Sequence, residues 1–289
     1  MTAAGHLEQI WRYPAKTMLG ERLDLTELTE AGVLGDRWWA IRDEVRGGQG
    51  SKKLPGLMQL SARYVTEPEH GAPPPPIEIR LPNGTVTSSE RTDVAVQLSE
   101  AVDHPVTLWP LQPPTDLDHY RRGTADHDDV MVELREFFGR TDAEPLPDVS
   151  WMPPELFEFE SLPGTYFDAL PIHLITTSSL RRLGELAPNS TIDVRRFRPN
   201  LVIDTDELSR EADWIEQDWI GRRLHVGGAQ IEIAGPCPRC VMTTRAVGEL
   251  GTDREVLRRI VADANQNFGV YATVTQAGSI RIGDEVRLT

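Results

Sequence analysis

The sequence predicts a mainly β protein with some helix (α+β), divided into two domains and a connecting segment. Three observations lead to this prediction. Short apolar runs separated by turn residues recur along the chain, which is typical of β domains. Only a few segments show the spacing of apolar residues that an amphipathic helix needs. An acidic stretch interrupted by prolines separates the two groups of strands.

Residues 1–112 are predicted to form a small, mostly β domain. Its strand candidates are apolar runs between turn signals, at Leu7–Tyr13, Trp38–Asp43 and Met58–Val65. The stretch Ile77–Val86 alternates apolar and polar residues around Pro82-Asn83-Gly84, which is a strong hairpin signal. The proline run just before it predicts a stiff surface connection.

Residues 113–150 are predicted to be a connection or insertion between the domains. This stretch is rich in aspartate and proline, and it contains one short amphipathic helix candidate, Val130–Phe138. The run Asp126–Asp129 offers metal ligands in principle, but it lacks the glycine and the distal glutamate of a calcium loop. A scaffold or a mobile flap is therefore the favoured interpretation of this run.

Residues 151–289 are predicted to form a β-barrel domain decorated with helices, because many short strand candidates alternate there with two helix candidates. A tryptophan-bearing turn at Asp213–Ile220 separates two of the strands. The helix candidates are Leu180–Leu186 and Glu255–Asn265, and the strand candidates are Pro171–Thr176, Leu201–Asp204, Ala229–Ala234, Gly269–Thr275 and Ser279–Leu288.

Composition and charge exclude several classes of protein. The formal net charge of −15 argues against nucleic-acid binding, because an acidic surface repels phosphate backbones. No stretch approaches the roughly 20 apolar residues that span a bilayer, and Met1–Lys16 lacks the pattern of a secretory signal. Two cysteines do not make a disulfide framework and indicate a reducing compartment. A cytoplasmic protein without nucleic-acid or membrane partners is expected.

The hexapeptide Gly235–Cys240, GPCPRC, holds both cysteines three positions apart. A thioredoxin-like redox pair would begin a helix, but the β-branched residues that follow Cys240 are poor at starting one. A structural zinc site needs four ligands, and neither a second CxxC nor paired histidines complete one. Zinc is therefore not expected.

Two interpretations of the hexapeptide stay open on spacing alone. One is a single thiolate, held in a turn by the flanking prolines, that serves a soft metal or a sulfur transfer. In that case Arg239 would favour the charged thiolate and help to neutralise an anionic ligand. The other is that both are ordinary buried cysteines, which is the usual fate of cysteine in cytosolic proteins.

Basic residues gather in a few short motifs of this acidic chain. The run Arg195–Asn200, RRFRPN, places three arginines just before a strand candidate, and Pro199 favours an extended conformation for Arg198. Guanidinium groups suit bidentate phosphate binding, although Arg195 also fits a solvated face that compensates local acids. Near the N-terminus, YPAKT and GDR each place a cation beside a hydroxyl or turn residue. An anion site is the function that these motifs share.

Taken in order, these motifs resemble the MOSC family, which is named after the C-terminal domain of molybdenum cofactor sulfurases. The resemblance is strongest to members with an N-terminal MOSC β-barrel, including the mitochondrial amidoxime-reducing component. It covers nearly all of the chain outside 113–150, and RFRPN followed by PCPRC is its most specific part. The matching motifs are WRYPAKT, GDRWW, RFRPNLVI, IGRRL, PCPRCVMTT, NFGVY and AGSIRIGDEVRL.

The resemblance implies two β-barrel-like domains, a MOSC N-terminal barrel and a MOSC barrel, with a molybdenum cofactor bound between them. It assigns the molybdenum ligand and catalytic residue to Cys240, while Cys237 is favoured as a packed bystander. Pyridoxal phosphate is not expected on this chain. The implied cofactor-binding residues are Lys16, Thr17, Arg37, Asp168, Ala169, Leu170, Arg198, Asn200, Arg239 and Tyr271.

The implied activity is reduction of a small N-hydroxylated or N-oxide substrate at the cysteine-ligated molybdenum. Because no cysteine-rich extension follows the last strand candidate, electrons are expected from a separate flavin or iron–sulfur protein. The alternatives are a sulfurtransferase with a persulfide on Cys240 and a non-catalytic cofactor carrier. The chain departs from the family pattern at Thr17, where serine is more usual, and at Pro238, where a small polar side chain can stand.

Overall fold

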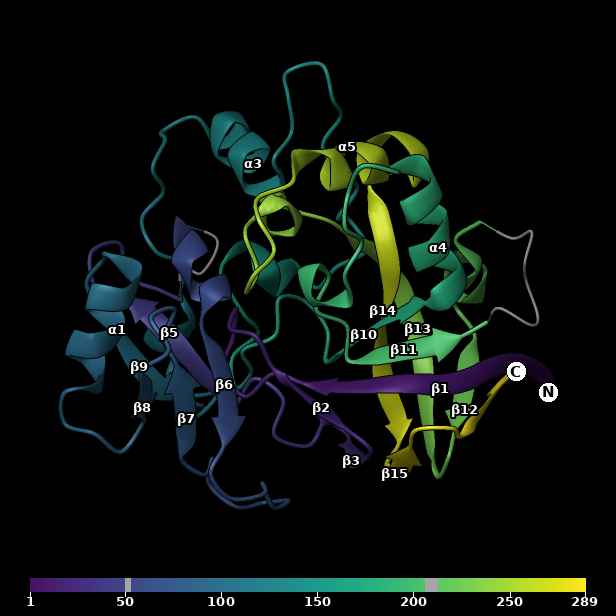
Figure 1. The fold of residues 1–289 in the computed structure, drawn as a ribbon, viewed down its shortest axis with the longest axis horizontal. Coiled ribbons are helices and arrows are strands. Elements are labelled where there is room, and N and C mark those ends of the chain that lie inside the picture. Colours follow the sequence, from purple (N-terminus) through teal and green to yellow (C-terminus); the bar gives the residue numbers. More distant parts are fainter. Residues whose placement is uncertain (50–52, 206–212) are drawn as a thin grey trace.

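The computed structural model describes residues 1–49, 53–205 and 213–289, and it confirms the mainly β class (Figure 1). Within these residues, seven strands close into a ring in the order β11-β10-β14-β13-β12-β16-β1, since β1 pairs back onto β11. The pair β10–β11 is parallel, and the other neighbours in the ring are antiparallel. The strands are β1 (Thr2–Arg12), β10 (Ile172–Thr176), β11 (Leu201–Asp204), β12 (Arg223–Val226), β13 (Ala229–Pro238), β14 (Asn267–Gln276) and β16 (Glu285–Leu288).

The barrel is filled by the inward side chains of these strands. Leu7 and Ile10 of β1 meet Leu201 and Ile203 of β11 in the same buried cluster. Alternation of buried and exposed positions along β1 and β13 follows from the period of two residues in a strand. Gly5 lies at a bulge in the pairing of β1 with β16, and a Cβ there would be 2.0 Å from the carbonyl oxygen of Asp204 in β11. Only glycine permits this approach of two strands.

The first strand therefore lies in the barrel that the C-terminal half of the chain builds. The short strand β2 (Glu21–Leu23) extends the sheet at β1, and β3 (Leu25–Thr29) pairs with β15 (Gly278–Arg281) and β4 (Gly32–Val33). The division into 1–112, 113–150 and 151–289 stays a prediction. Strand β1 belongs to residues 1–112 but pairs with β11 and β16, which belong to residues 151–289. Figure 1 shows β1 running from the barrel toward the smaller sheets.

The smaller sheets contain the remaining N-terminal strands. The pair β5 (Trp39–Asp43) and β9 (Val106–Pro110) and the sheet β6 (Ser61–Tyr64), β7 (Ile77–Arg80), β8 (Val86–Ser88) share a second core with α1 (Val94–Val102). The predicted hairpin is confirmed as β7–β8. The predicted strand Met58–Val65 is partly wrong, because Pro55–Gln59 forms a 3₁₀ turn (η2) that starts at a proline and buries Leu57 and Met58.

Helices cover one end of the barrel. The helices α4 (Thr177–Leu186) and α5 (Arg254–Asp263) pack with Phe197 and Phe268 in a third buried cluster. Both begin at capping side chains, Thr176 and Asp253, which accept hydrogen bonds from the first turn. The predicted helix Val130–Phe138 is confirmed as α3, and Gly139 ends it in the left-handed conformation.

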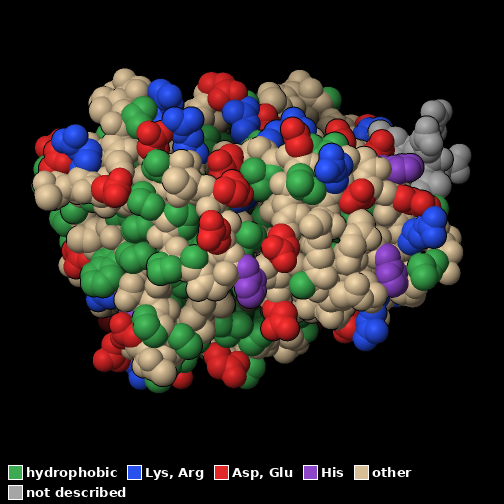
Figure 2. Space-filling model, turned by 90° about the horizontal axis from the view of Figure 1, so that it is seen from below, with side chains coloured by type: hydrophobic (Ala, Val, Ile, Leu, Met, Phe, Trp, Pro, Cys, Tyr) green, Lys and Arg blue, Asp and Glu red, His purple; other side chains and the backbone are tan. Residues whose placement is uncertain are grey.

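Among the described residues, no helix combines the length and the apolar character of a membrane span. The remaining elements are short. They are α2 (Leu117–Tyr120) and the 3₁₀ turns η3 (Pro154–Phe157), η4 (Val194–Arg196), η5 (Ile215–Trp219) and η6 (Val241–Thr244). Seen from below, acidic side chains are spread across the surface rather than gathered in one patch (Figure 2).

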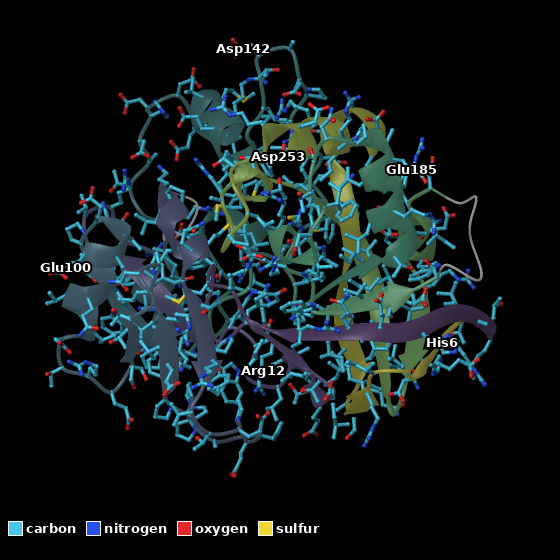
Figure 3. All side chains as sticks on the ribbon, in the orientation of Figure 1. His6, Arg12, Glu100, Asp142, Glu185 and Asp253 are labelled. Atoms are coloured by element: carbon cyan, nitrogen blue, oxygen red, sulfur yellow. The ribbon has the colours of Figure 1, made fainter. Side chains whose placement is uncertain are left out.

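Arg12 joins the barrel to the smaller sheets at the end of β1 (Figure 3). Its guanidinium is buried, pairs with Glu21 at 2.9 Å and with Glu67, and lies 5.1 Å from the ring centroid of Tyr64 on β6. The motif that follows, Tyr13 to Thr17, is thereby held at the junction of the two groups of strands.

Candidate functional site

Cys240 lies in the short connection between β13 and η6. Pro238 ends β13, and Cys240 precedes the 3₁₀ turn in extended backbone with φ −111°. Its side chain is half-buried, whereas Cys237, in the last part of β13, is fully buried. The turn after Cys240 is a single 3₁₀ turn rather than an α-helix, so the thiol does not stand at a helix N-terminus as in a thioredoxin-like pair.

Arg239 lies across the site and holds three elements together. Its Nη1 is 3.0 Å from the sulfur of Cys237 and 3.4 Å from His173 Nε2, and its Nη2 donates to the carbonyl of Phe197 at 2.8 Å. The remaining side-chain nitrogen, Nε, is buried and has no hydrogen-bond partner in the part of the chain that the structure describes. Cys237 thus serves as an acceptor for Arg239.

His173 and Tyr271 form an aromatic wall beside this arginine. They are register partners in the β10–β14 pair, and their ring centroids lie 5.8 Å apart. The ring centroid of Trp151 lies 6.3 Å from that of Tyr271. Burial, followed by the charge of Arg239, lowers the pKa of His173 to about 3, so this ring is neutral at pH 7. Burial raises the pKa of Tyr271, so its hydroxyl is a donor there.

A second cationic group lies at the N-terminal side of the site. The guanidinium carbons of Arg198 and Arg37 lie 4.2 Å and 5.0 Å from the ring centroid of Tyr13. Asp36 pairs with Arg37 and also accepts the backbone N–H of Tyr13 at 2.7 Å. Arg198 and Arg37 are thus two cations that lie close together in a buried place. Burial, followed by the charge of Arg37, lowers the pKa of Arg198 to about 10.

Three predicted site residues occupy the left-handed region of backbone space. Thr17, Arg37 and Arg198 have φ values of 72°, 55° and 57°. The expectation that Pro199 keeps Arg198 extended is therefore wrong. Tertiary contacts override the local preference, because the guanidinium of Arg198 bonds the carbonyl of Met18 and lies over Tyr13. Strained backbone of this kind concentrates at functional sites.

Lys16 contacts polar residues on the N-terminal side of the site. Its buried ammonium donates to the hydroxyl of Ser161 at 2.6 Å and lies 3.4 Å from Gln49 Oε1. It also pairs with Asp168 at 4.0 Å. The negative charge of Asp168 acts on Arg37 and Arg198 as well, so this exposed carboxylate stands between Lys16 and the arginines.

Three other predicted residues, Asn200, Ala169 and Leu170, contribute through backbone contacts or burial. Asn200 is fully buried, and its amide binds backbone only, accepting from His173 N–H at 3.1 Å and donating to Trp11 O at 3.3 Å. It ties β1 to β10 and so positions the loop that carries Arg198. Ala169 is buried and Leu170 is half-buried, directly before β10.

Sequence reasoning missed four residues around this site. Tyr13 belongs to the WRYPAKT motif, yet nothing in the sequence marked its ring as the surface under two arginines. His173 and Trp151 carried no local signal, since their neighbours come from distant strands. Arg140, from the 113–150 segment, reaches the Cys240 connection.

Comparison with known proteins identifies the part of the chain that carries most of these residues. Residues 163–287 match the family model of the MOSC domain. This part of the chain is a MOSC domain. The match includes Arg198, Arg239, Cys240 and Tyr271, while Lys16, Thr17 and Arg37 lie outside it. The seven-stranded ring of the MOSC domain is closed by β1, which also lies outside the matched residues.

Curated relatives extend the similarity beyond the MOSC domain. The chain is 25% identical to the rat "Mitochondrial amidoxime reducing component 2" over 98% of this chain and 82% of the relative, and 22% identical to the human protein of that name over 98% and 83%. It is 31% identical to the Drosophila melanogaster "Molybdenum cofactor sulfurase" over 35% of this chain and 12% of that protein. A solved structure, the YuaD protein from Bacillus subtilis, aligns with a TM-score of 0.44 at 10% identity over 98% of this chain and 94% of that one.

Proposed function

We propose that this protein binds the molybdenum cofactor with Cys240 as the metal ligand and reduces N-hydroxylated or N-oxide compounds. The MOSC domain and the full-length similarity to proteins named amidoxime reducing components support a function tied to this cofactor. The reaction class follows the names of these relatives, and the roles of individual residues rest on the geometry of the site.

The observation that carries the proposal is a set of buried guanidinium nitrogens without partners. Arg37 Nε, Arg198 Nη2 and Arg239 Nε are each buried and make no hydrogen bond within the described residues. A buried charged donor without an acceptor costs several kcal/mol by itself. Three such donors fit an anionic ligand with several acceptor oxygens, and the phosphate of the pterin supplies such acceptors.

Each residue has a definite role in this proposal. Arg37 and Arg198 would hold the phosphate, with Tyr13 keeping their planes in place. Cys240 would ligate molybdenum, since a thiolate suits a soft metal, and the buried Cys237 would only fix Arg239. When bound, the cofactor supplies a two-electron centre that accepts an oxygen atom from the substrate.

The reaction balances with two electrons and two protons. The N–O bond of the substrate breaks. With an N-hydroxylated substrate, one proton goes to the nitrogen and the other leaves with the hydroxyl as water. With an N-oxide, both protons go to the oxygen, which leaves as water. The electrons would come from a separate flavin or iron–sulfur protein. The half-buried Cys240 is the residue on which the sulfurtransferase alternative depends, in which a persulfide on its thiol transfers sulfur without metal.

The test uses purified protein loaded in a cofactor-competent host, with reduced viologen dye as the electron donor. Addition of an aromatic amidoxime should oxidise the dye, with one amidine formed per two electrons. Cys240→Ala should remove this activity, and Cys237→Ala should retain most of it. The sulfurtransferase would be favoured over the reductase by a different result. In that case the wild type would not oxidise the dye and would carry the cyanide-labile sulfur of a persulfide, and Cys240→Ala would lack this sulfur.

A further inference from the structure

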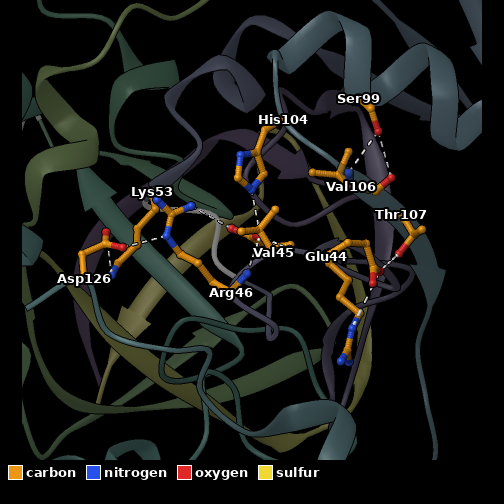
Figure 4. Close-up of polar contacts among 11 residues, drawn as sticks. Glu44, Val45, Arg46, Lys53, Ser99, His104, Val106, Thr107 and Asp126 are labelled. Atoms are coloured by element: carbon orange, nitrogen blue, oxygen red, sulfur yellow. Dashed lines mark hydrogen bonds and ion pairs between the residues drawn. The ribbon is translucent and has the colours of Figure 1, made fainter.

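The 113–150 segment is attached to the rest of the protein at both ends of α3. Before the helix, Asp126 pairs with Arg46 at 2.8 Å and with Lys53 at 2.9 Å (Figure 4). After the helix, Gly139 turns the chain so close to η6 that a Cβ at this position would be 3.2 Å from Val241 Cα. This second attachment lies next to Cys240.

Arg140 follows this turn and is buried, with 7% of its surface exposed. Its Nη2 donates to the carbonyl of Arg239 at 3.0 Å, and its Nε donates to Gln266 Oε1 at 2.9 Å. It also bonds the carbonyl of Phe138, the last residue of α3. One guanidinium thus connects the end of α3, the residue before Cys240 and the start of β14.

Gln266 closes the arrangement from the opposite side. Its carbonyl accepts the backbone N–H of Arg239 at 3.0 Å, and its side-chain amide lies 3.4 Å from the carbonyl of Leu146 in the same 113–150 segment. Its φ of 69° is in the left-handed region, which a non-glycine residue adopts when its surroundings require it. Both backbone polar groups of Arg239 are therefore held, one by Gln266 and one by Arg140.

We propose that Arg140 and Gln266 form a clamp on the backbone of Arg239 that sets the direction of the Cys240 thiolate. The metal-ligand role of Cys240 rests on the proposed function, whereas the clamp itself rests on the contacts above. In this view the 113–150 segment is a working part of the site. Arg140 and Gln266 are positioning residues that act through Arg239.

Arg140 can act on Cys240 in two ways, through its hydrogen bond to the Arg239 backbone and through the field of its positive charge. Substitution separates these two effects. Cys240 is one of the groups whose charge acts on Arg140. Lysine keeps this charge, but its point-like ammonium cannot bond two acceptors in one plane as a guanidinium does. If the hydrogen bonds of Arg140 matter and its charge does not, Arg140→Lys should show the same Arg239 amide exchange as Arg140→Met.

Arg135 offers a matched control within the same segment. It also donates to two backbone carbonyls, Thr141 at 2.7 Å and Glu144 at 2.8 Å, but both acceptors belong to the segment itself. Arg135→Met therefore removes a similar pair of bonds without touching the Cys240 connection.

Hydrogen exchange of metal-free protein provides the first readout. The amide of Arg239 should exchange about tenfold faster in Arg140→Met, Arg140→Lys and Gln266→Leu than in Arg135→Met. Each of these three variants weakens or removes side-chain bonds that hold Arg140 and Gln266 against the Arg239 backbone, which makes local opening easier. The double variant of Arg140 and Gln266 should be less than additive, since both residues hold one backbone unit. If Arg140→Met does not fold, Gln266→Leu carries the comparison.

Molybdenum release from loaded protein provides the second readout, in the presence of a chelator. Arg140→Met should lose metal about tenfold faster than Arg135→Met, in line with loss of one charge-assisted hydrogen bond. Equal exchange of the Arg239 amide in all variants, or wild-type exchange in Arg140→Lys, would overturn the clamp. Faster exchange with unchanged metal release would overturn its effect on Cys240. Absence of molybdenum from the wild type would overturn the proposed function and leave the exchange result to decide the clamp.

Discussion

The guanidinium of Arg198 lies 4.2 Å from the ring centroid of Tyr13, and the Tyr13 hydroxyl donates to the carbonyl of Pro199 at 2.9 Å. The same tyrosine thus supports the side chain of Arg198 and the backbone directly after it. This relationship joins the end of β1 to the MOSC domain. It also explains how an arginine before a proline stays in the left-handed conformation.

Replacement of Arg198 should weaken cofactor binding without unfolding the protein. Arg198→Met removes a buried guanidinium whose Nη2 has no partner among the described residues. The affinity for the pterin should therefore fall by about ten- to a hundredfold, the range of one or two charge-assisted hydrogen bonds. The matched control is Arg195→Met, since Arg195 pairs with Asp193 and Glu249 at the surface. Fluorescence of the oxidised pterin released from each variant measures the difference. Equal loss in both variants would contradict the assignment.

The two contacts of Tyr13 can be separated by substitution. Tyr13→Phe removes the bond to Pro199 but keeps the ring, so the free energy of unfolding should fall by about 1 kcal/mol or somewhat more, with pterin content unchanged. Tyr13→Leu also removes the cation–π contacts and should lower both quantities. Urea unfolding and pterin analysis of the same samples measure them. A normal pterin content in Tyr13→Leu would show that the ring does not position the arginines.

Stability should fall in acid through His173. Its pKa in the folded protein is depressed, from 6.5 to about 3, so the folded state disfavours the proton. The stabilising contribution of the neutral ring is therefore complete above pH 6.5 and is lost as the pH falls toward 3. His173→Gln should be less sensitive to pH across this window, whereas His70→Gln, at an exposed position, should keep the wild-type slope. Chemical denaturation at several pH values tests this, and identical slopes in all three proteins would refute it.

Gly235 provides the space for Trp151. A Cβ at position 235 would lie 2.7 Å from the indole ring, so Gly235→Ala should push Trp151 away from Tyr271 and destabilise the protein by about 1–3 kcal/mol. Gly251→Ala is the control, because nothing lies within 4 Å of a Cβ there. Trp151→Ala should largely suppress the extra cost of Gly235→Ala. Additive costs in the double variant would show that the two residues do not compete for this space.

Local patterns predicted the elements whose signals are local. The Asn83-Gly84 turn predicted the β7–β8 hairpin, and the apolar spacing in Val130–Phe138 predicted α3. The 3₁₀ turn at Pro55 was missed because its apolar residues, Leu57 and Met58, are buried like those of a strand. The place of β1 in the barrel was missed because strand pairing is set by partners about 200 and 280 residues away, which no local pattern encodes.

The candidate site divides in the same way. Residue type indicated Cys240 and the arginines, since thiolates and guanidinium groups have few chemical uses in such motifs. The partners of these residues come from distant elements, so Tyr13 under Arg198, His173 beside Arg239 and the reach of Arg140 appear only in the structure. The role of Lys16 stays a prediction: its motif suggested an anion site, and its ammonium lies 2.6 Å from the Ser161 hydroxyl and 4.0 Å from Asp168.

The most direct test of the central claim is the molybdenum content of wild type, Cys240→Ala and Cys237→Ala after expression in a cofactor-competent host. Elemental mass spectrometry gives the metal-to-protein ratio for each. We expect near-stoichiometric molybdenum in the wild type and in Cys237→Ala, and its loss in Cys240→Ala. Equal molybdenum in the wild type and Cys240→Ala, or none in the wild type, would contradict Cys240 as the metal ligand.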